Sequence, residues 1–377
     1  MDQFHDIRPY NDDEVAEVLA NLINKPDFIH TIIGFRIPNL PKVLRAPLAL
    51  AVKLVLKRQI AKIHNVHDFQ TRVASYMERM IKTTTTNVEY RGIEKLQKGV
   101  GYLFISNHRD IAMDPAFVNY GLFLAGLNTV RIAIGDNLLS RPFVSDLMRL
   151  NKSFIVKRSA NGIREKMAAF GQLSAYINHS ITNDHCSLWI AQKEGRAKDG
   201  LDKTDPAIIK MFYMNKKKQS SFMDAMQELN IVPVSISYEY DPCAMDKAAE
   251  LHEKSTTGNY QKSEFEDIDS IKNGIVGQKG KVIVTFGDVL QAGFATPDEL
   301  VTEIDRQIIG NYAIHSTNAA ALAMQQGQPC TDSVFETYME ACPAELRETV
   351  LAMYANPAIQ QRQQLAMSAD KPTDESV

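Results

Sequence analysis

Residues 101–117 have the sequence GYLFISNHRDIAMDPAF, and this stretch indicates the fold class. An apolar run from Tyr102 to Ile105, bounded by glycine, is typical of a short buried strand. Polar residues follow, and a helical pattern then begins at Asp114 and Pro115. Aspartate at the N-cap with proline in the first turn is a strong signal for the start of a helix. The stretch therefore predicts a strand, a polar turn and a helix in succession.

His108 lies in the polar turn, at the carboxyl end of the predicted strand, where open α/β sheets bind their ligands. Two carboxylates follow it, Asp110 and Asp114. A carboxylate that binds one imidazole nitrogen fixes the tautomer and raises the basicity of the other nitrogen. We therefore predict that His108 is a general base for a hydroxyl group. Asp114 could instead be only a helix cap, and Asp110 only a solvated turn residue.

Composition and charge exclude several classes of protein. Hydrophobic residues make up 45% of the 377 residues and charged residues 23%, which are ordinary globular values. The net charge of −3 argues against a general nucleic-acid binder. The four cysteines lie far apart, without the paired spacing of a zinc site, so we expect a reducing compartment and no metal. The first 20 residues lack the basic and then apolar pattern of a signal peptide.

Residues 28–67 contain seven basic residues and no acidic residue. Hydrophobic residues recur beside them at helical spacing: Leu48, Val52, Val55, Leu56 and Ile60. A basic amphipathic helix suits an anionic membrane surface, and the alternative is a helix packed on the domain with a solvated basic face. No apolar run approaches the roughly 20 residues needed to cross a bilayer. We therefore expect a cytoplasmic protein that associates peripherally with a membrane.

Strand and helix patterns alternate from residue 88 to about residue 290. Apolar or alternating runs typical of strands end at Tyr90, Ile105, Ile134, Val156, Ala191, Tyr240 and Phe286. Helical patterns separate most of these runs, at residues 114–127, 142–150, 161–177 and 223–229. This alternation predicts the α/β class, with a mixed, largely parallel sheet flanked by helices.

We expect three segments along the chain. Residues 1–87 form an N-terminal helical region with the basic amphipathic segment, and residues 88–300 form the α/β domain. Residues 301–377 form C-terminal helices and a disordered tail, which begins near Gln360. Residues 244–280 are charged and rich in turn signals, and they are predicted to be an excursion that either covers the site or forms a helical insert.

The histidine and one aspartate also fit a known pattern. Asn107-His108, five further residues and Asp114-Pro115 resemble the histidine–aspartate motif of the glycerolipid acyltransferases, the superfamily of glycerol-3-phosphate and lysophosphatidate acyltransferases. That family usually has four residues between the histidine and the aspartate, whereas this chain has five. With one extra residue in the turn, either Asp114 or Asp110 could pair with His108.

Two further blocks match motifs of this family in the expected order. Residues 135–158 are similar to the second block, which ends in basic residues that contact the acceptor. Residues 189–196 are similar to the third block, whose glutamate, glycine and arginine lie at the acceptor phosphate. The resemblance implies that five residues of these blocks bind substrate: Lys157, Arg158, Glu194, Gly195 and Arg196.

A fourth block and a late strand complete the resemblance. Residues 231–234 are similar to the family's fourth motif, a strand whose proline, here Pro233, lies beside the acyl site. Residues 281–287 match a late strand that ends in Phe-Gly. The resemblance covers about residues 88–290 and implies the fold and the activity of this family.

Basic side chains suit a phosphate-bearing acceptor independently of the resemblance. A guanidinium can bind two phosphate oxygens at once, and Arg158 and Arg196 both follow predicted strands. Lys157 and Lys193 accompany them. A surface ion pair is the alternative role for each of these residues taken singly.

The implied reaction is a direct transfer of an acyl group. His108, held by the aspartate, deprotonates a hydroxyl of glycerol-3-phosphate or of a lysophospholipid, which attacks the thioester of acyl-CoA or of acyl-carrier protein. We expect no cofactor besides this co-substrate. No Gly-x-Ser-x-Gly motif is present and no cysteine lies in a block, so an acyl-enzyme is not predicted. Backbone N–H groups at the start of the Asp114 helix could stabilise the oxyanion.

Two other functions also fit the sequence. The acceptor could be another lipid alcohol or an amine, and the extra residue in the turn leaves open a catalytically idle membrane-binding protein. A hydrolase that uses His108 with a serine is disfavoured by the missing Gly-x-Ser-x-Gly motif. We therefore predict a membrane-associated acyltransferase of phospholipid biosynthesis that binds no nucleic acid.

Overall fold

The computed structural model of the chain describes residues 2–37, 41–139, 141–263, 266–291 and 293–369. The chain divides into two compact units, each built from two separate stretches of sequence. Unit 1 is Met1–Tyr76 with Arg131–Tyr176, and unit 2 is Met77–Val130 with Ile177–Val377. The boundaries of these units differ from those of the three predicted segments, because residues 131–176 cluster with the N-terminal helices.

Unit 2 is built on five strands. They are β1 (Thr85–Arg91), β2 (Leu103–Ser106), β5 (Leu188–Ala191), β6 (Ile231–Tyr238) and β7 (Gly280–Phe286). Their order across the sheet is β1-β7-β6-β2-β5. Among these five strands, β6 and β7 pair antiparallel and the other neighbours pair parallel. The prediction of a mixed, largely parallel sheet is therefore confirmed.

Apolar residues place the central strands of unit 2 inside the protein. Every residue of β2 and β6 is buried, and Leu103 of β2 lies in register with Leu188 of β5 and Ile231 of β6. A strand that is buried on both faces needs a continuous apolar run rather than an alternating one. Phe104 of β2 contacts Phe286 of β7, with 5.5 Å between the ring centroids. The apolar run before His108 therefore becomes a central strand of this sheet.

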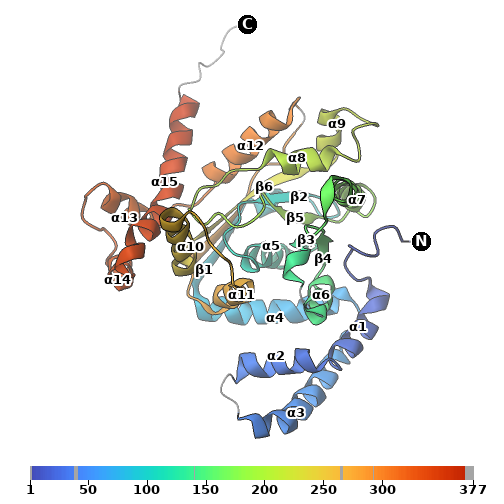
Figure 1. Cartoon of the computed structure of the whole chain (residues 1–377). Helices are drawn as coiled ribbons and strands as arrows, with labels where there is room; N and C mark the ends of the chain where they lie inside the picture. Colours follow the sequence, from blue (N-terminus) through green and yellow to red (C-terminus); the bar gives the residue numbers. More distant parts are fainter. Residues whose placement is uncertain (1, 38–40, 140, 264–265, 292, 370–377) are drawn as a thin grey trace. The chain divides into compact units, whose positions relative to one another are not determined.

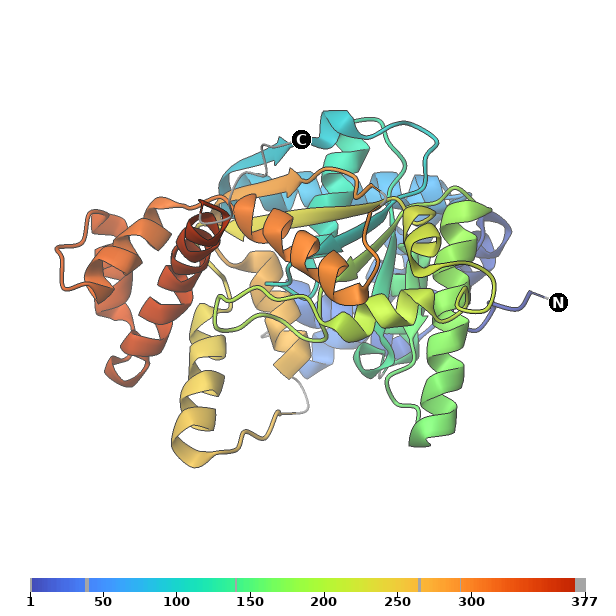
Figure 2. The ribbon, with the colours of Figure 1, turned by 90° about the horizontal axis from the view of Figure 1, so that it is seen from above.

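Helices cover both faces of the sheet of unit 2, as predicted. α5 (Met113–Leu124) and α12 (Pro297–Gly310) lie on opposite faces (Figure 1, Figure 2). Phe117 of α5 contacts Tyr238 of β6, with 5.9 Å between the ring centroids. α12 begins at a Thr296 N-cap with Pro297 in the first turn, which is the signal that its sequence carries.

The remaining helical elements of unit 2 lie between the strands or after the last of them. They are η2 (Ile93–Lys95), α8 (Pro206–Tyr213), α9 (Phe222–Gln227), α10 (Ala244–Thr257), α11 (Glu266–Val276), α13 (Ser316–Gln325), α14 (Ser333–Ala341), η4 (Ala344–Leu346) and α15 (Arg347–Ala369). The excursion predicted at residues 244–280 is thus the helix pair α10–α11. Phe335 of α14 contacts Tyr354 of α15 with 5.1 Å between ring centroids, in a core that α10 and α13 share.

The predicted disordered tail is wrong over its first part. α15 continues to Ala369, so residues 360–369 are helical, and residues 370–377 lie outside the described residues. Tertiary contacts explain the difference. The glutamines of this stretch, which make it polar in sequence, donate to backbone carbonyls of other segments: Gln360 to Asp202, Gln361 to Ile309 and Gln364 to Arg306.

Unit 1 contains the N-terminal helices and two parallel strands. Its elements are η1 (Asp12–Glu14), α1 (Val15–Leu22), α2 (Pro26–Arg36), α3 (Lys42–Ile60), β3 (Arg131–Gly135), η3 (Asp136–Leu138), α6 (Pro142–Leu150) and β4 (Ser153–Val156). α4 (Val66–Thr84) and α7 (Gly162–Thr182) begin in unit 1 and end in unit 2. The predicted helical N-terminal region is confirmed. Its core includes Leu19 and Leu22 of α1, Ile29 and Ile33 of α2, and Phe143 of α6.

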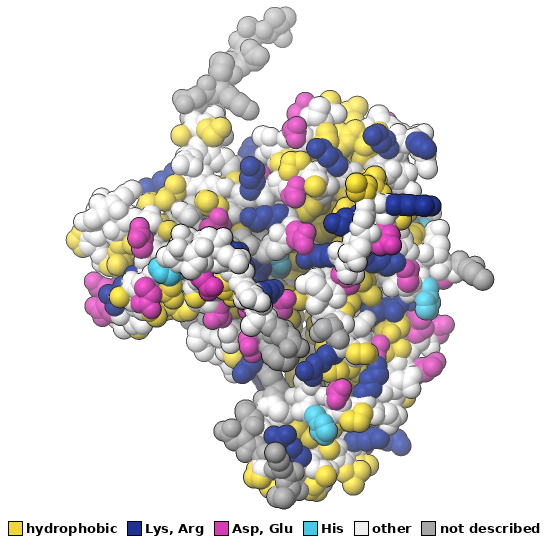
Figure 3. Space-filling view, in the orientation of Figure 1, with side chains coloured by type: hydrophobic (Ala, Val, Ile, Leu, Met, Phe, Trp, Pro, Cys, Tyr) yellow, Lys and Arg dark blue, Asp and Glu magenta, His cyan; other side chains and the backbone are white. Residues whose placement is uncertain are grey.

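α3 carries apolar side chains on more than one side. Five of them pack against the core of unit 1: Leu48, Ala49, Val52, Leu56 and Ile60. Four others are exposed by half or more: Leu44 (50%), Leu50 (63%), Leu54 (55%) and Val55 (53%). Figure 3 shows hydrophobic and basic side chains next to one another over α2 and α3, at the bottom of the view. None of the described helices is both long enough and apolar enough to span a bilayer.

Candidate active site

His108 follows β2 directly, and its imidazole binds the carboxylate of Asp114. The Nδ1 atom of His108 lies 2.8 Å from Oδ2 of Asp114. A carboxylate can only accept, so Nδ1 carries the proton and Nε2 is left as the basic nitrogen. The side chain of Asp114 is fully buried, whereas that of His108 remains 13% exposed. This geometry suits a general base whose tautomer is fixed from the inside of the protein.

Asp114 accepts hydrogen bonds from four groups. Besides His108, the backbone N–H groups of Arg109 (2.6 Å) and Asp110 (2.9 Å) donate to Oδ2. The hydroxyl of Tyr238, the last residue of β6, donates to Oδ1 at 2.7 Å. Burial acts to raise the pKa of Asp114, but the hydrogen bond and charge of His108, with the other donors, hold this pKa below its usual value. Backbone groups of the five-residue turn therefore hold the Asp114 carboxylate in its ionised form.

Asp110 binds backbone N–H groups at the start of α5 rather than His108. Its Oδ1 atom accepts from the N–H groups of Ala112 (2.9 Å) and Met113 (2.8 Å), where α5 begins. Burial and then the charge of Asp114 raise the pKa of Asp110. Asp114, not Asp110, is therefore the partner of His108 in the structure. Ala112 and Met113 donate to Asp110, so their N–H groups are not free for the oxyanion that is expected at the start of α5.

The residues on either side of His108 are anchored to one buried carboxylate, that of Asp202. Its Oδ2 atom lies 2.7 Å from Nη2 of Arg109 and 3.3 Å from Nδ2 of Asn107. Burial acts to lower the pKa of Arg109, and the charge of Asp202 overcomes this effect and raises it. Removing one partner of a buried ion pair costs about 3–5 kcal/mol. The position of His108 therefore depends on Asp202, which lies 93 positions after Arg109 and 95 positions after Asn107 in the chain.

The loop after β5 brings Arg196 close to the histidine. The N–H of Ala197 donates to the carbonyl oxygen of His108 at 2.8 Å. Nη2 of Arg196 donates to the hydroxyl of Ser270 in α11 at 3.2 Å. The other terminal nitrogen, Nη1, is buried and has no hydrogen-bond partner among the described residues. Arg196 therefore keeps a donor that an anion could use.

Three other predicted substrate-binding residues also lie in unit 2. Glu194 is exposed. Gly195 has φ +76°, the left-handed conformation that favours glycine, and no atom lies within 4 Å of where a Cβ would stand. Pro233 is buried in β6, in register with Ile105 of β2, so it lies inside the sheet rather than at its carboxyl end.

Lys157 and Arg158 follow β4 and belong to unit 1. Nζ of Lys157 lies 2.5 Å from the carboxylate of Asp6, as its alternative role as an ion-pairing residue implies. Arg158 is exposed, and its backbone N–H donates to Asp136 at 3.1 Å. The convergence of Lys157 and Arg158 with His108 stays a prediction, because His108 belongs to unit 2.

Three residues that contact the site are not among those predicted from the sequence. Tyr238 lies at the end of a predicted strand, the one signal that could have marked it, and burial raises its pKa well above 10, so that it remains a neutral donor. The Trp189 ring packs edge-on against that of His108, with 5.8 Å between centroids. Asp202 has no local signal, because only the fold brings it to His108. Within the described residues, no group of three or more His, Cys, Asp or Glu side chains is placed to hold a metal ion.

Comparisons with known proteins point to one family. Residues 87–237 match the family described as Acyltransferase, in agreement with the predicted resemblance of these residues to acyltransferases. A search of curated proteins found no match. Among solved structures, the chain is similar to the 1-acyl-sn-glycerophosphate acyltransferase PlsC of Thermotoga maritima, at 14% identity and a TM-score of 0.34, over 78% of this chain and 91% of that chain. Similarity this low supports no argument about function.

Proposed function

Because residues 87–237 match the acyltransferase family, we propose that this protein moves a fatty acyl group from a thioester to a hydroxyl of glycerol-3-phosphate or of a lysophospholipid. The observation that carries the proposal is the His108–Asp114 pair, at 2.8 Å, with Nε2 as the free base. The donor is acyl-CoA or acyl-carrier protein. The product would be a precursor of membrane phospholipids.

The reaction needs one base and no acyl-enzyme. Nε2 of His108 takes the proton of the acceptor hydroxyl as its oxygen attacks the thioester carbonyl. The C–S bond then breaks, and the imidazolium of His108 returns the proton to the leaving thiolate. Asp114 stabilises the imidazolium between these two steps, because its low pKa keeps it ionised. No group of the protein is oxidised, reduced or acylated at the end of the cycle.

Arg196 is the residue that we assign to the acceptor phosphate. Its Nη1 atom has no partner among the described side chains and backbone groups, and a phosphate oxygen would satisfy it. The hydrogen bond from the N–H of Ala197 to the carbonyl of His108 holds the backbone that follows Arg196 against the backbone of His108. Such an arrangement favours a hydroxyl that lies near a phosphate over an alcohol or an amine that has none.

Arg196→Ala is expected to raise the KM for a phosphorylated acceptor about 10- to 100-fold, because a hydrogen bond to a charged group is lost. The KM for the acyl donor should change by no more than about twofold. Lys198→Ala is the matched control: it removes the same charge two residues away, from an ammonium that pairs with Glu250. Steady-state kinetics with each substrate varied in turn measure both constants. An equal rise of the acceptor KM in Arg196→Ala and Lys198→Ala would contradict a direct contact between Arg196 and the phosphate.

A panel of acceptors tests the proposed function. Purified protein is given an acyl thioester with glycerol-3-phosphate, lysophosphatidate, a lysophospholipid, a phosphate-free monoacylglycerol or an amine-bearing lipid, and products are identified by mass spectrometry. We expect esters of the phosphorylated acceptors. Preference for the phosphate-free alcohol or for the amine would favour the alternative acceptor class, and no product from any pair would favour a catalytically idle membrane-binding protein.

The membrane is the second partner that we propose, and α3 is the element that would contact it. Leu50 and Leu54 are exposed on this helix, which also carries Lys53 and Lys57. Apolar side chains flanked by cations suit an interface with anionic lipid, where each cation contributes about 1 kcal/mol.

The double variant Leu50→Glu, Leu54→Glu should weaken co-sedimentation with anionic liposomes at least tenfold, since each apolar side chain contributes about 1.5 kcal/mol or more on burial. Leu124→Glu is the control, because Leu124 is equally exposed but lies on α5. Binding of the unchanged protein should also fall as salt rises or as neutral lipid replaces anionic lipid. Salt-insensitive binding would mean that the basic side chains are not the anchor.

A further inference from the structure

Helix α15 lies outside the residues that match the acyltransferase family, yet it holds the loop next to His108. Oε1 of Gln360 accepts from the N–H of Asp202 at 3.0 Å, and Nε2 of Gln360 donates to the carbonyl of Asp202 at 2.6 Å. One turn earlier, Asn356 donates to the carbonyl of Asp199 at 2.8 Å. We propose that α15 is a positioning element of the active site, and that Gln360 is its main contact.

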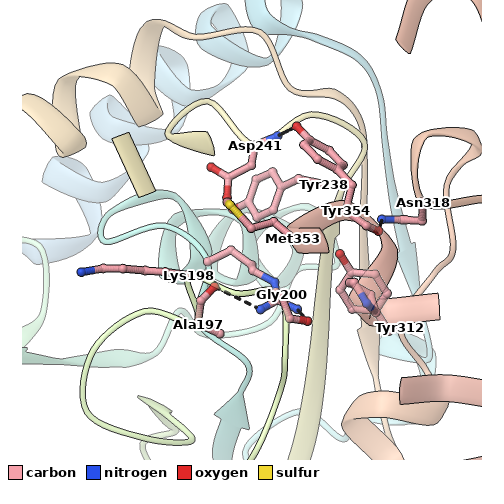
Figure 4. Close-up of a pocket in the computed structure, with 11 residues that line it drawn as sticks. Ala197, Lys198, Gly200, Tyr238, Asp241, Tyr312, Asn318, Met353 and Tyr354 are labelled. Atoms are coloured by element: carbon pink, nitrogen blue, oxygen red, sulfur yellow. Dashed lines mark hydrogen bonds between the residues drawn. The ribbon is translucent and has the colours of Figure 1, made fainter. Parts of the chain in front are cut away.

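The backbones of the loop and the helix are in direct contact at Gly200. This residue has φ +80°, and a Cβ there would stand 2.2 Å from the carbonyl oxygen of Met353. Figure 4 shows Gly200 and Met353 among the residues that line a cavity at this contact. The cavity drawn there has a volume of about 30 Å³, enough for two or three water molecules at roughly 10–15 Å³ each. It is too small for a substrate, so α15 supports the loop and does not line a substrate cleft here.

A continuous set of hydrogen bonds runs from Gln360 to both neighbours of His108. Gln360 fixes the backbone of Asp202, and the Asp202 carboxylate binds Arg109 and Asn107. Arg109 also donates to the carbonyl of Gly200 at 3.1 Å, which ties the same loop to the turn a second time. A displacement of about 1 Å in a catalytic group can cost on the order of 100-fold in rate. Gln360 touches no reacting group, so its effect would be exerted through Asp202.

The next residue, Gln361, makes a matched comparison possible. Its Nε2 atom lies 3.0 Å, 3.2 Å and 2.9 Å from the carbonyl oxygens of Ile309, Gly310 and Tyr312. These contacts join α15 to the last turn of α12 and to the backbone of Tyr312 just after it, and none of them involves the loop after β5. Two adjacent glutamines of one helix thus make comparable hydrogen bonds to different parts of unit 2.

The test compares Gln360→Ala with Gln361→Ala in the full chain, and its kinetic part rests on the proposed acyl transfer. Gln361→Ala should lower the Tm at least as much as Gln360→Ala but leave kcat within about twofold. Gln360→Ala should lower kcat about tenfold or more at a temperature far below its Tm. Equal losses of kcat in the two variants would overturn the inference, because α15 would then act only through stability.

Trypsin gives a second measurement that does not depend on acyl transfer. The loop contains cleavage sites at Arg196 and Lys198. Mass spectrometry should detect cleavage at these two sites several-fold faster in Gln360→Ala than in the unchanged protein or in Gln361→Ala. Equal rates of cleavage in Gln360→Ala and Gln361→Ala would contradict the inference. If the unchanged protein transfers no acyl group, the proposed function fails, whereas faster cleavage in Gln360→Ala alone would still support the positioning of the loop by α15.

Discussion

His108→Ala is expected to reduce acyl transfer by about 10²–10⁴-fold, the usual contribution of a general base. Among the described groups that bind Asp114, His108 alone has a basic nitrogen, and neither Asp114 nor Tyr238 can replace it. The Asp114 carboxylate is buried behind the imidazole, and the Tyr238 hydroxyl is a neutral donor. The loss should appear in kcat, measured as acceptor-dependent release of thiol, while the KM for the donor changes little.

The fold should survive this substitution. Asp114 keeps three of its four donors, from Arg109, Asp110 and Tyr238. His179→Ala is the matched control, since Nε2 of His179 lies 3.4 Å from Asp184 on the surface and outside the site. It should leave both kcat and the circular dichroism spectrum unchanged. Activity retained by a folded His108→Ala protein would refute His108 as the base.

Asp114→Asn should have the second largest effect, a fall in kcat of roughly 10²–10⁴-fold. An amide in place of this carboxylate cannot stabilise an imidazolium, and its NH₂ group would face N–H donors. The pKa of Asp114 is lowered in the folded protein, so its charge stabilises the fold above the unfolded pKa near 4, and this stability is lost as pH falls through the folded value. At pH 7 the variant should therefore also have a lower Tm, and kcat must be measured well below it.

Asp110→Asn is the comparison that makes this result specific. Burial and Asp114 raise the pKa of Asp110, so its ionised form destabilises the fold above the unfolded pKa near 4. An asparagine oxygen can still accept from Ala112 and Met113. We expect a Tm at pH 7 that is unchanged or higher, and a kcat within a few-fold of the unchanged protein. A loss as large as that of Asp114→Asn would mean that both carboxylates take part in the reaction.

The order of strands and helices was largely predictable, because local patterns determine it. The helix predicted at residues 142–150 is α6 with the same bounds, and the apolar run before His108 is β2. α8 was missed, although Asp205 caps it and Pro206 opens it, as Thr296 and Pro297 open α12. The start of α8 therefore does have a local signal in the sequence.

The partners of the site residues were not predictable, because they lie far away in the chain. Tyr238 donates to Asp114 over 124 positions, and Asp202 binds Arg109 over 93 positions. Spacing along the sequence leaves both Asp110 and Asp114 able to reach His108. In the structure, Tyr238 of β6 donates to Asp114, and Asp114 is the carboxylate that binds His108. For the same reason the sequence places Gln360 in a disordered tail, since the backbone N–H and carbonyl that it binds belong to Asp202, in the loop after β5.

The most direct test of acyl transfer is to follow thiol release and ester formation together, with purified protein, an acyl thioester and saturating acceptor. Our account predicts one ester for each thiol released and almost no thiol without acceptor, because the acceptor hydroxyl is the nucleophile that His108 activates. Thiol release at the same rate with and without acceptor, accompanied by free fatty acid, would show a hydrolase and contradict the account.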